Sequence, residues 1–438
     1  MRYPGSIITL SVFLFFCSAV PAAAESPVPF DWTGSSFQPH HPSIDALAAV
    51  LLDAETGTVL YAHNRHKVLP PASLVKLPVM YTLLEEVDRG NLDVDADIPI
   101  PSQAWAQNAP PHSSLMFLGP GQRASLNDLL LGLAVTSGND AAVGAALLLD
   151  DSVESFVARV NQMLQEMGLQ HTRLVEPSGY SRDNTTTADE FARFAREYVR
   201  SFPEAIERYH SVRSFGYPRA ENLLPGSSEQ VIMQQNYNRL LWIMPDADGL
   251  KTGTTPSAGY NLAATAERNG RRLISVVLGV QAGNSREGNM KRAEISRDLL
   301  EYGFREYVAM PPRLPDPGTV RMYGTAVASM DLYVDAEWAP GDSAEGSGEA
   351  LPLVLPRQLA GSMQAVYEVP RRLRGPVQAG TQVGRVVFTF GEQEVFSAPV
   401  RAAQTAAKGP WWRRVLDWFR LWFERLQGTD FPPNSEDL

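Results

Sequence analysis

A serine and a lysine stand three residues apart where an apolar-periodic stretch begins, within residues 71–76 (Pro-Ala-Ser-Leu-Val-Lys). Residues at this spacing share one face of a helix. Ser73 would lie at the helix start, where backbone N–H groups and the helix dipole favour developing negative charge. Lys76, one turn later, can accept the hydroxyl proton, so the pair predicts an activated nucleophile and its base. The apolar residues that follow recur at helical intervals and predict a buried helix: Leu77, Met80, Leu83, Leu84 and Val87.

Two considerations weaken this pair when it is taken alone. Pro78 removes a backbone donor inside the predicted helix. A Ser-x-x-Lys pair also occurs by chance in any long chain, most often as two solvated residues on a surface helix. The chemistry therefore depends on whether other parts of the chain complete a site.

Two further short motifs follow in the chain. Ser137-Gly138-Asn139 directly precedes an alanine-rich helix predicted for residues 140–149. Lys251-Thr252-Gly253 precedes a strand predicted for residues 273–280. Each motif is weak by itself, since the first is typical of a turn and the second of a strand end.

Composition limits the classes of protein and of site. A length of 438 residues predicts two or more domains. The net charge of −11 argues against nucleic acid as a partner. The single cysteine, Cys17, lies in the N-terminal apolar run. Beyond that run the chain therefore has no cysteine for a disulfide, a thiolate nucleophile or a metal site.

Residues 1–24 have the organisation of a secretory signal peptide. Arg2 supplies a basic start, residues 7–16 form an apolar core too short to span a bilayer, and residues 22–24 are three alanines. We expect cleavage after Ala24. A lipoprotein site at Cys17 is the weaker alternative, because two phenylalanines precede it. The expected location is exported, periplasmic or peripheral on the outer face of the cytoplasmic membrane.

The elements that position the motifs are expected within residues 45–310, after a Pro/Ser-rich linker at 25–44. Apolar runs at 47–52 and 59–61, with a turn between them, predict a β-hairpin. Residues 211–235 look polar and irregular. Alternation of strands and helices predicts a mixed α/β domain with an antiparallel sheet. Further helices are predicted at residues 126–133, 153–167, 186–200, 203–210 and 291–302.

The character of the chain changes after Pro311. Short alternating stretches separated by Gly/Pro turns predict a small all-β domain at about residues 314–405. Its clearest feature is a hairpin, with strands at 386–390 and 395–400.

Residues 408–428 form an amphipathic tail. Aromatic and aliphatic residues recur at helical spacing, and five basic residues against two acidic ones give residues 408–427 a net charge of +3. This many charges makes a membrane-spanning helix implausible, whereas tryptophans on a basic amphipathic helix suit a membrane interface. The alternative is a helix that packs on its own protein. The tryptophans are Trp411, Trp412, Trp418 and Trp422.

The three motifs together, in their order along the chain, are a more specific signal than any one of them alone. Ser-x-x-Lys, Ser-x-Asn and Lys-Thr-Gly occur in that order in penicillin-binding proteins and class A β-lactamases. The chain resembles the low-molecular-mass penicillin-binding proteins that act as D-alanyl-D-alanine carboxypeptidases. Other stretches share the resemblance: residues 113–118, 120–121, 238–241, 248–254 and 258–262. It covers about residues 45–308, and the β domain and tail fit that family in outline.

The resemblance implies a serine peptidase that shortens peptidoglycan stem peptides. Ser73 would attack the carbonyl between the two terminal D-alanines and form an acyl-enzyme. Lys76 would be the general base, with the nearby cation Lys251 as a physical route to its neutral form. Backbone N–H groups of Ser73 and Thr254 would form the oxyanion hole. β-Lactam antibiotics would acylate the same serine.

Further roles follow from the same resemblance. Ser137 would relay a proton to the leaving D-alanine, and Asn139 would hold the substrate amide and Lys76. Lys251, Thr252 and Thr254 would bind the terminal carboxylate of the substrate. The family implies no cofactor and no metal.

Two other functions compete with the carboxypeptidase. A β-lactamase shares the acyl-enzyme chemistry but releases the drug quickly. Residues 176–180 (Glu-Pro-Ser-Gly-Tyr) lie where class A β-lactamases carry Glu-Pro-x-x-Asn, but Tyr180 replaces the asparagine and Gly138 the usual aspartate. We therefore expect Glu176 to be structural. A non-catalytic scaffold would not need Ser73, Lys76 and the other motif residues intact.

Overall fold

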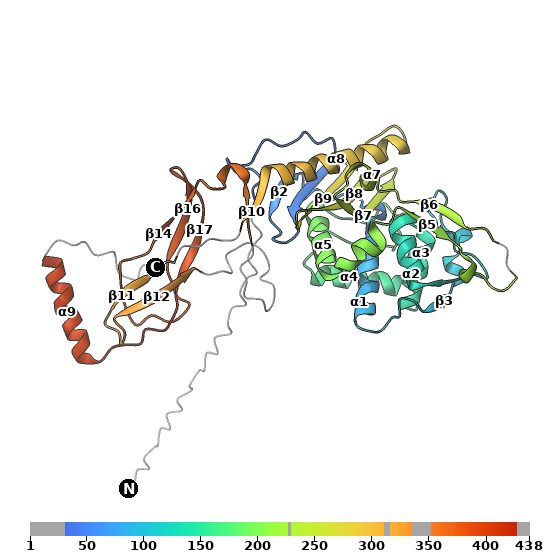
Figure 1. Ribbon diagram of the computed structural model, residues 1–438. Coiled ribbons are helices and arrows are strands. Elements are labelled where there is room, and N and C mark those ends of the chain that lie inside the picture. The colour runs from blue at the N-terminus through green and yellow to red at the C-terminus, as the bar shows by residue number, and fades with distance from the viewer. Residues whose placement is uncertain (1–30, 227–228, 311–315, 335–351, 427–438) are drawn as a thin grey trace, which may run out of the picture.

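The computed structural model describes residues 31–226, 229–310, 316–334 and 352–426. The chain folds into an α/β part that carries the three motifs and a β-rich part that ends in a helix (Figure 1). The predicted signal peptide, residues 1–24, and residues 342–349, whose composition predicts an exposed loop, lie outside the described residues.

A five-stranded sheet forms the centre of the α/β part, with strand order β2-β1-β9-β8-β7 and antiparallel pairing throughout. The predicted hairpin supplies β1 and β2, and the sequence-distant strand β9 pairs with β1. The prediction of a mixed α/β fold with an antiparallel sheet is therefore confirmed. The strands are β1 (Ala48–Asp53), β2 (Val59–His63), β7 (Ala247–Thr255), β8 (Gly259–Arg268) and β9 (Arg271–Val280).

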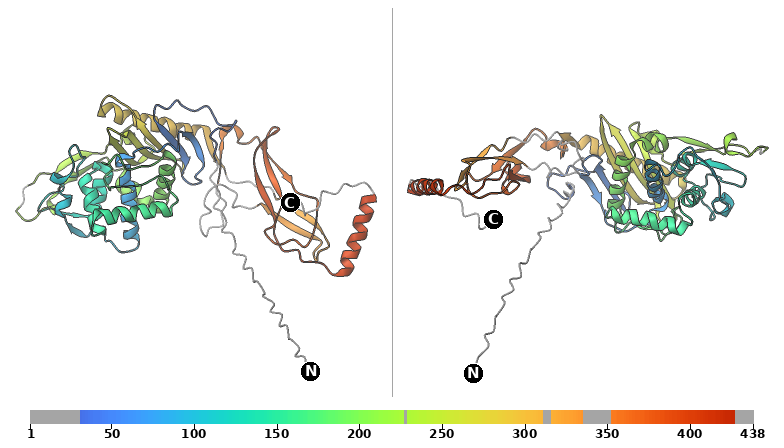
Figure 2. Two further views of the ribbon diagram at one scale, coloured as in Figure 1. Left: turned by 180° about the vertical axis from the view of Figure 1, so that it is seen from behind. Right: turned by 90° about the horizontal axis from the view of Figure 1, so that it is seen from below.

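Both faces of this sheet are covered by helices. Successive side chains of a strand point to opposite faces, so β1 contributes to two separate cores. Val50 and Leu52 pack in the core that also holds the helices near the motifs. Ala49 and Leu51 pack in a second core, against α8 (Ser285–Glu306), which lies along the other face (Figures 1 and 2).

The helices agree with the predicted ones in place but differ at their ends. The helix predicted at 126–133 continues as a π-helical segment over residues 132–136. Ser137 follows directly as the C-cap of that segment. The helix predicted at 203–210 is a single turn, α6 (Pro203–Ala205), followed by a π-helical segment at 206–210. The others are α2 (Leu126–Leu131), α3 (Asn139–Leu149), α4 (Val153–Glu166) and α5 (Ala188–Ser201), and the single turn α7 (Leu240–Ile243) was not predicted.

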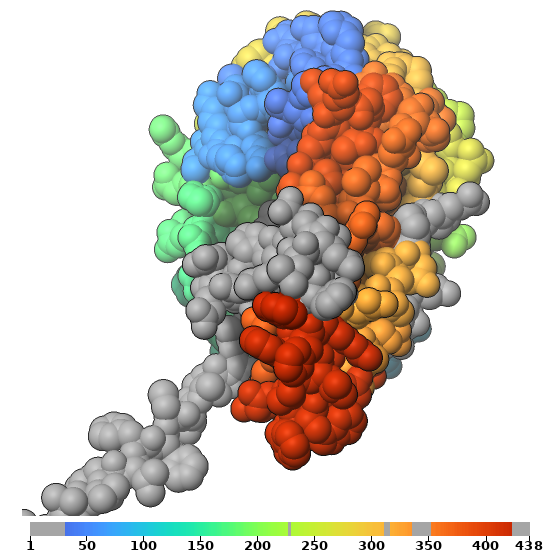
Figure 3. All heavy atoms as spheres, turned by 90° about the vertical axis from the view of Figure 1, so that its left-hand side faces the viewer, coloured from blue at the N-terminus to red at the C-terminus, as the bar shows by residue number. Residues whose placement is uncertain are grey.

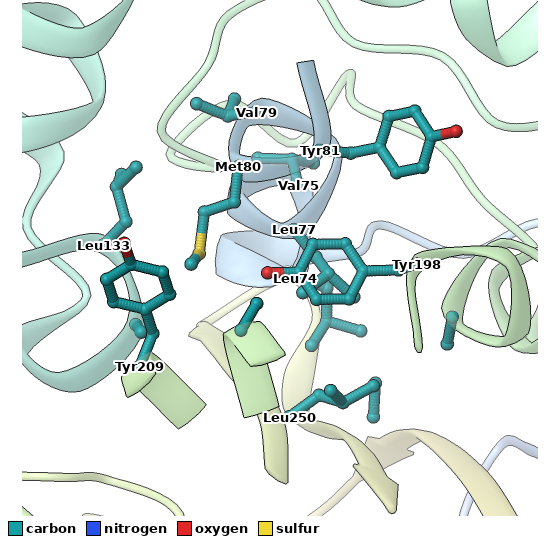
Figure 4. Close-up of a cluster of buried hydrophobic side chains, with 14 of the residues drawn as sticks. Leu74, Val75, Leu77, Val79, Met80, Tyr81, Leu133, Tyr198, Tyr209 and Leu250 are labelled. Carbon is teal, nitrogen blue, oxygen red and sulfur yellow. The ribbon is translucent and has the colours of Figure 1, made fainter. Parts of the chain in front are cut away.

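Pro78 does not disturb the nucleophile helix. Residues 72–75 form one 3₁₀ turn, and α1 (Lys76–Asp88) begins only at Lys76. Pro78 therefore lies in the first turn of α1, where a backbone N–H has no intrahelical partner in any case. Figure 4 shows Leu77 and Met80 of α1 among Leu133, Tyr198 and Leu250 from other elements, in the buried core.

The sequence suggested that residues 211–235 are irregular, and this prediction is wrong. They contain a short antiparallel hairpin, β5 (Ser214–Tyr217) and β6 (Ile232–Gln235). Each strand has four residues and the β6 side chains are mostly exposed, so the alternation that marks a half-buried strand is too short to recognise. A second short pair joins β3 (Asp97–Pro99) to β4 (Arg123–Ser125).

The predicted linker at residues 25–44 packs against the folded chain from residue 31 onward. Trp32 is buried, and its indole N–H donates to the Val354 carbonyl at 2.9 Å. Asp31 forms an ion pair with Arg65. The Pro/Ser-rich composition of residues 25–44 did not predict these contacts, because a single buried tryptophan gives no periodic pattern.

The β-rich part contains a six-stranded sheet with the order β14-β16-β17-β12-β11-β15. The predicted hairpin is β16 with β17, and β15 pairs in parallel with β11. One strand from the region predicted as the β domain, β13 (Leu353–Pro356), lies outside this sheet and pairs with β10 (Tyr307–Met310), which follows α8. The sheet strands are β11 (Thr319–Tyr323), β12 (Ser329–Val334), β14 (Met363–Glu368), β15 (Arg372–Arg374), β16 (Gln382–Phe390) and β17 (Gln393–Ala402).

The tail forms α9 (Trp411–Leu426), which lies at the end of the molecule away from the helices of the α/β part (Figures 1 and 3). It contacts the β-rich part through a polar side. The Asp417 carboxylate accepts the Gly324 N–H at 2.9 Å, and the Arg413 guanidinium donates to the Ala326 carbonyl at 2.8 Å. Among the residues that the structure describes, none of the helices combines the length and apolar character needed to cross a bilayer.

Candidate active site

Ser73 and Lys76 meet as the sequence predicted. Lys76 Nζ lies 3.0 Å from Ser73 Oγ and 2.8 Å from Asn139 Oδ1. The Ser178 carbonyl contacts both residues: it accepts the Ser73 hydroxyl at 3.3 Å and a short hydrogen bond from Lys76 Nζ. The hydroxyl therefore has a nitrogen base within hydrogen-bond distance, which is the geometry that proton abstraction requires.

Burial prepares Lys76 to act as a base. The side chain has no exposed surface, and this desolvation lowers the pKa of Lys76 to about 7, although the charges of Glu176 and Asp140 oppose the change. The prediction that the Lys251 cation provides this effect needs correction, because burial is the dominant cause. A substantial fraction of Lys76 is then neutral near pH 7.

Ser137 and Lys251 form a second pair beside the first. Lys251 Nζ donates to Ser137 Oγ at 2.9 Å, and both side chains are buried. Burial, followed by the charges of Lys76 and Arg292, lowers the pKa of Lys251 well below its ordinary value. Ser137 has a left-handed backbone (φ 56°), which ends the π-helical segment and separates it from α3.

Asn139 connects the pair around Ser73 to a loop that precedes the Ser137 motif. Its amide nitrogen donates to Ser113 Oγ at 2.9 Å while its oxygen holds Lys76 Nζ. The neighbouring Asp140 accepts backbone N–H groups of residues 116–118 and thereby fixes this loop against α3. The sequence identified Asn139 but gave Asp140 no role.

Two glycines let backbone segments approach the nucleophile. A Cβ atom on Gly253 would lie 2.6 Å from the Pro71 carbonyl oxygen, and one on Gly179 would lie 2.2 Å from the Ala72 carbonyl oxygen. Gly179 also has a positive φ of 84°, which L side chains rarely adopt. These close approaches bring β7 and the 176–181 loop against the turn that carries Ser73.

Thr252 and Thr254 follow Lys251 on β7. Thr252 is buried, whereas Thr254 is exposed. The buried Arg292 of α8 donates to Thr254 Oγ1 at 2.9 Å and to the Gly253 carbonyl at 3.1 Å. Sequence reasoning missed Arg292, although its position four residues after Gly288 and four before Ser296 placed a cation on the buried face of α8.

Glu176 is hydrogen-bonded to residues of its own loop. Its carboxylate accepts backbone N–H groups from Ser178, Gly179 and Ser181, and the amide of Asn184 at 2.7 Å. Burial opposes its ionisation, but the hydrogen bonds, led by those from Ser178 and Asn184, outweigh burial and lower the pKa of Glu176. The carboxylate therefore acts as an anchor for the loop that supplies the Ser178 carbonyl.

Replacing Glu176 by glutamine tests this structural role. An amide supplies one acceptor oxygen where several donors converge, so we expect a loss of stability of about 1–3 kcal/mol. The ratio of deacylation to acylation rates should stay unchanged, since Glu176 has no free oxygen for a water. Thermal melting and single-turnover kinetics measure the two quantities. Selective slowing of deacylation by roughly 10²-fold, the scale of a lost general base, would contradict a structural role.

No cluster of three or more histidine, cysteine, aspartate or glutamate side chains able to hold a metal ion occurs in the described part of the chain. The groups gathered at the site are hydroxyls, amines, amides and backbone carbonyls, with the Arg292 guanidinium and the carboxylates of Asp140 and Glu176 beside them. The arrangement is that of nucleophilic catalysis on an acyl group, with two lysines and a hydroxyl to move protons.

Comparison with known proteins identifies the family. The model of the peptidase S11 family, described as D-alanyl-D-alanine carboxypeptidase, matches residues 35–282. The chain belongs to this family of serine peptidases. D-alanyl-D-alanine carboxypeptidase DacC of Escherichia coli is 30% identical over 429 residues, which cover 96% of each chain. DacD of Salmonella typhimurium is 32% identical over 417 residues, covering 94% of this chain and 97% of the relative.

Solved structures of a penicillin-binding protein and of a D-alanyl-D-alanine carboxypeptidase share the fold. Penicillin binding protein 5 from Haemophilus influenzae superimposes with a TM-score of 0.68 at 28% identity, covering 84% of this chain and 99% of that one. DacD from Francisella tularensis gives a TM-score of 0.70 at 26% identity, covering 84% and 95%. The match therefore extends beyond the α/β part, and the predicted fold class and family are both confirmed.

Proposed function

We propose that the chain removes the terminal D-alanine from peptidoglycan stem peptides through an acyl-enzyme on Ser73, and that penicillins acylate the same oxygen. The observation that carries this proposal is the 3.0 Å separation between Ser73 Oγ and Lys76 Nζ, whose pKa is about 7. In the reaction, neutral Lys76 takes the hydroxyl proton as Ser73 Oγ attacks the carbonyl. Water later releases the shortened peptide.

The second pair, Ser137 and Lys251, protonates the leaving group and binds the terminal carboxylate. Ser137 relays a proton to the amine of the departing D-alanine, with Lys251 hydrogen-bonded to its oxygen. Lys251, Thr252 and Thr254 bind the substrate carboxylate, whose negative charge favours the protonated form of Lys251. Arg292, bonded to Thr254, adds positive charge on the same side. Backbone N–H groups of Ser73 and Thr254 serve as the oxyanion hole.

The contacts of Glu176 favour a carboxypeptidase over a β-lactamase. Rapid drug release needs a base that activates a water on the acyl-enzyme. Each oxygen of Glu176 is already bonded to its own loop, and Tyr180 occupies the position of the expected asparagine. The acyl-enzyme with penicillin should therefore persist.

The pH dependence of acylation tests this proposal. The reactive form of Lys76 is the neutral amine, so the acylation rate should rise as pH increases through about 7 and level off above that value. The measurement is the rate constant for penicillin labelling between pH 5.5 and 9, made by stopped-flow. A rate that is independent of pH across this range would assign the base to another group.

The amphipathic helix α9 supports a peripheral membrane location after export. Its tryptophans are exposed, Trp411 by 75% and Trp418 by 55%, while Asp417 and Leu421 face the protein. This orientation leaves the tryptophan side chains at the surface, which supports a membrane-facing helix over one that packs its apolar face on its own protein. A helix with this face and a basic charge excess suits the interface of anionic lipid.

Deletion of the chain after Ala407 tests the membrane proposal. We expect the shortened protein to become soluble and to keep its penicillin labelling, because the site residues lie in the α/β part. The measurement is membrane fractionation with a labelled penicillin as readout. The matched variant replaces Trp411, Trp418 and Trp422 by serine and keeps the polar contacts of Asp417. Persistent membrane binding of both variants would place the anchor elsewhere, and loss of labelling on truncation would make α9 part of the fold.

A further inference from the structure

The strand that carries Lys251 lies at the end of the sheet order, so β8 is its one sheet partner in the described part of the chain. The pairing of β7 with β8 is also irregular between Ala247 and Gly249, shortly before the motif. An edge strand leaves backbone groups on its open side that the sheet ladder does not pair. Contacts on that open side therefore bear on where the Lys251 side chain lies.

Two side chains hold consecutive carbonyls of β7 just before Lys251. Asn238 Nδ2 donates to the Gly249 carbonyl at 3.0 Å. His210 Nδ1 lies 3.0 Å from the Leu250 carbonyl oxygen. The Leu250 carbonyl and the Lys251 N–H belong to one planar peptide unit. A group that fixes this oxygen therefore fixes the plane in which the backbone enters Lys251.

The ring of His210 is neutral near pH 7. It is fully buried at the end of the π-helical segment 206–210. Burial lowers the pKa of His210 to about 4, with a smaller contribution from the charge of Lys251, although the hydrogen bond to Leu250 opposes the change. The ring therefore adds no second cation beside Lys251.

The partners of the neutral ring assign its tautomer. A carbonyl oxygen only accepts hydrogen bonds, so Nδ1 of His210 must carry the proton. Nε2 is then an acceptor, and the hydroxyl of Tyr198, 2.8 Å away, donates to it. Tyr198 belongs to α5 and lies in the buried core (Figure 4). The hydroxyl thereby fixes the orientation and the tautomer in which His210 donates to β7.

The surrounding backbone brings the ring to this carbonyl. Asn236 Nδ2 donates to the Val212 carbonyl at 3.0 Å and to that of His210 at 3.4 Å, which holds the chain just after the π-helical segment. On the other side, a Cβ atom at Gly249 would lie 3.2 Å from the Cβ atom of His210. Glycine at position 249 therefore permits the close approach of the two segments.

We propose that His210 is a positioning residue for Lys251. Oriented by Tyr198, it holds the Leu250 carbonyl on β7. It thereby places the Lys251 amine, which contacts Ser137 Oγ at 2.9 Å and binds the terminal carboxylate of the substrate. The proposal rests on the proposed carboxypeptidase function. His210 acts through β7 rather than on the substrate, so its loss should affect substrates in proportion to their use of Lys251.

Two substitutions of His210 separate its two hydrogen bonds. His210→Asn keeps a donor at the position of Nδ1 and loses the partner of Tyr198. His210→Gln keeps a polar group at the position of Nε2 and loses the donor to Leu250. Each variant loses one buried hydrogen bond, so the two melting temperatures should fall by similar amounts. A merely structural histidine would therefore give two variants of equal activity.

Two substrates with the same acyl half measure the effect on Lys251. N-acetyl-L-alanyl-D-alanyl-D-alanine has the terminal carboxylate, whereas N-acetyl-L-alanyl-D-alanine methyl thioester lacks it and releases methanethiol, a good leaving group. We expect His210→Gln to lower kcat/KM for the peptide roughly tenfold or more, the scale of a misplaced binding group, and to leave that for the thioester nearly unchanged. His210→Asn should retain most of the wild-type kcat/KM for both substrates. Equal losses in the two variants on the peptide, or parallel losses on both substrates in His210→Gln, would overturn the proposal.

The tautomer in the full wild-type chain gives a test that requires no variant. NMR of protein with nitrogen-15-labelled histidine should show a neutral ring protonated at Nδ1. The signal is assigned to His210 by its nuclear Overhauser contact with the Tyr198 ring, whose centroid lies 5.3 Å away. A ring protonated at Nε2, or at both nitrogens at pH 7, would contradict the contacts on which the positioning role depends.

The same measurements separate this inference from the proposed function. A wild-type chain that hydrolyses the peptide, with two variants that match each other, rejects the positioning role alone. A wild-type chain that releases no D-alanine from the peptide rejects the carboxypeptidase function and the positioning role with it.

Discussion

Replacing Ser73 by alanine is expected to lower the turnover of a D-Ala-D-Ala peptide by roughly 10⁵-fold or more and to abolish covalent penicillin labelling. The hydroxyl is the group placed against a nitrogen base at 3.0 Å, and alanine leaves no oxygen to be acylated. The change removes two hydrogen bonds of the hydroxyl, one to the Ser178 carbonyl and one from Lys76 Nζ, but Lys76 keeps Asn139 and Ser178 as partners, so the fold should persist. Release of D-alanine measures turnover, and thermal melting confirms folding.

Ser201→Ala is the matched control for this variant. Ser201 lies at the end of α5 and is exposed, and its hydroxyl donates to Glu197, one turn earlier on the same helix, at 2.9 Å. It should retain wild-type turnover. Stoichiometric labelling of the Ser73→Ala protein would require a different nucleophile and would contradict the assignment.

Replacing Lys76 by alanine should reduce acylation by about 10²–10⁴-fold, the range expected for a lost general base. Without the amine, the remaining partner of the Ser73 hydroxyl among the described hydrogen bonds is the Ser178 carbonyl, which is not basic. The residual rate should also lose the rise with pH through about 7 that the wild type shows. The rate constant for penicillin labelling, measured across that pH range, checks both expectations.

Two matched variants separate the base from other roles of Lys76. Lys76→Met keeps the length of the side chain without a basic group, and Lys76→Arg keeps a positive charge that does not dissociate near neutral pH. Both should be as slow as alanine. Near-wild-type acylation by the arginine variant would mean that the charge of Lys76, rather than its proton affinity, supports the reaction.

The sequence was most informative where chemistry depends on residue type and short spacing. The spacing of Ser73 and Lys76 on one helical turn predicted their contact, and the order of the three motifs predicted the family that the comparisons establish. The antiparallel sheet followed from the hairpin at β1 and β2 and the late strand β9. In each case the signal lies in residue types and their spacing along the chain, which the sequence shows directly.

The parts that escaped prediction depend on contacts between distant segments or on backbone atoms. The Ser178 carbonyl, which contacts both Ser73 and Lys76, has no signature because every residue has a carbonyl. Arg292 reaches Thr254 from another element, so only tertiary packing reveals its contact with the site. The dominant cause of the lowered pKa of Lys76 is likewise burial by several elements, which spacing alone does not report.

Labelling of the full chain with a fluorescent penicillin is the measurement that tests the central claim most directly. The account predicts one label per chain, located by peptide mapping on Ser73, which persists after free drug is removed. A label that forms on Ser73 and disappears rapidly would identify a β-lactamase. Absence of any label, or a label on another residue, would contradict the assignment of Ser73 as the acylated nucleophile.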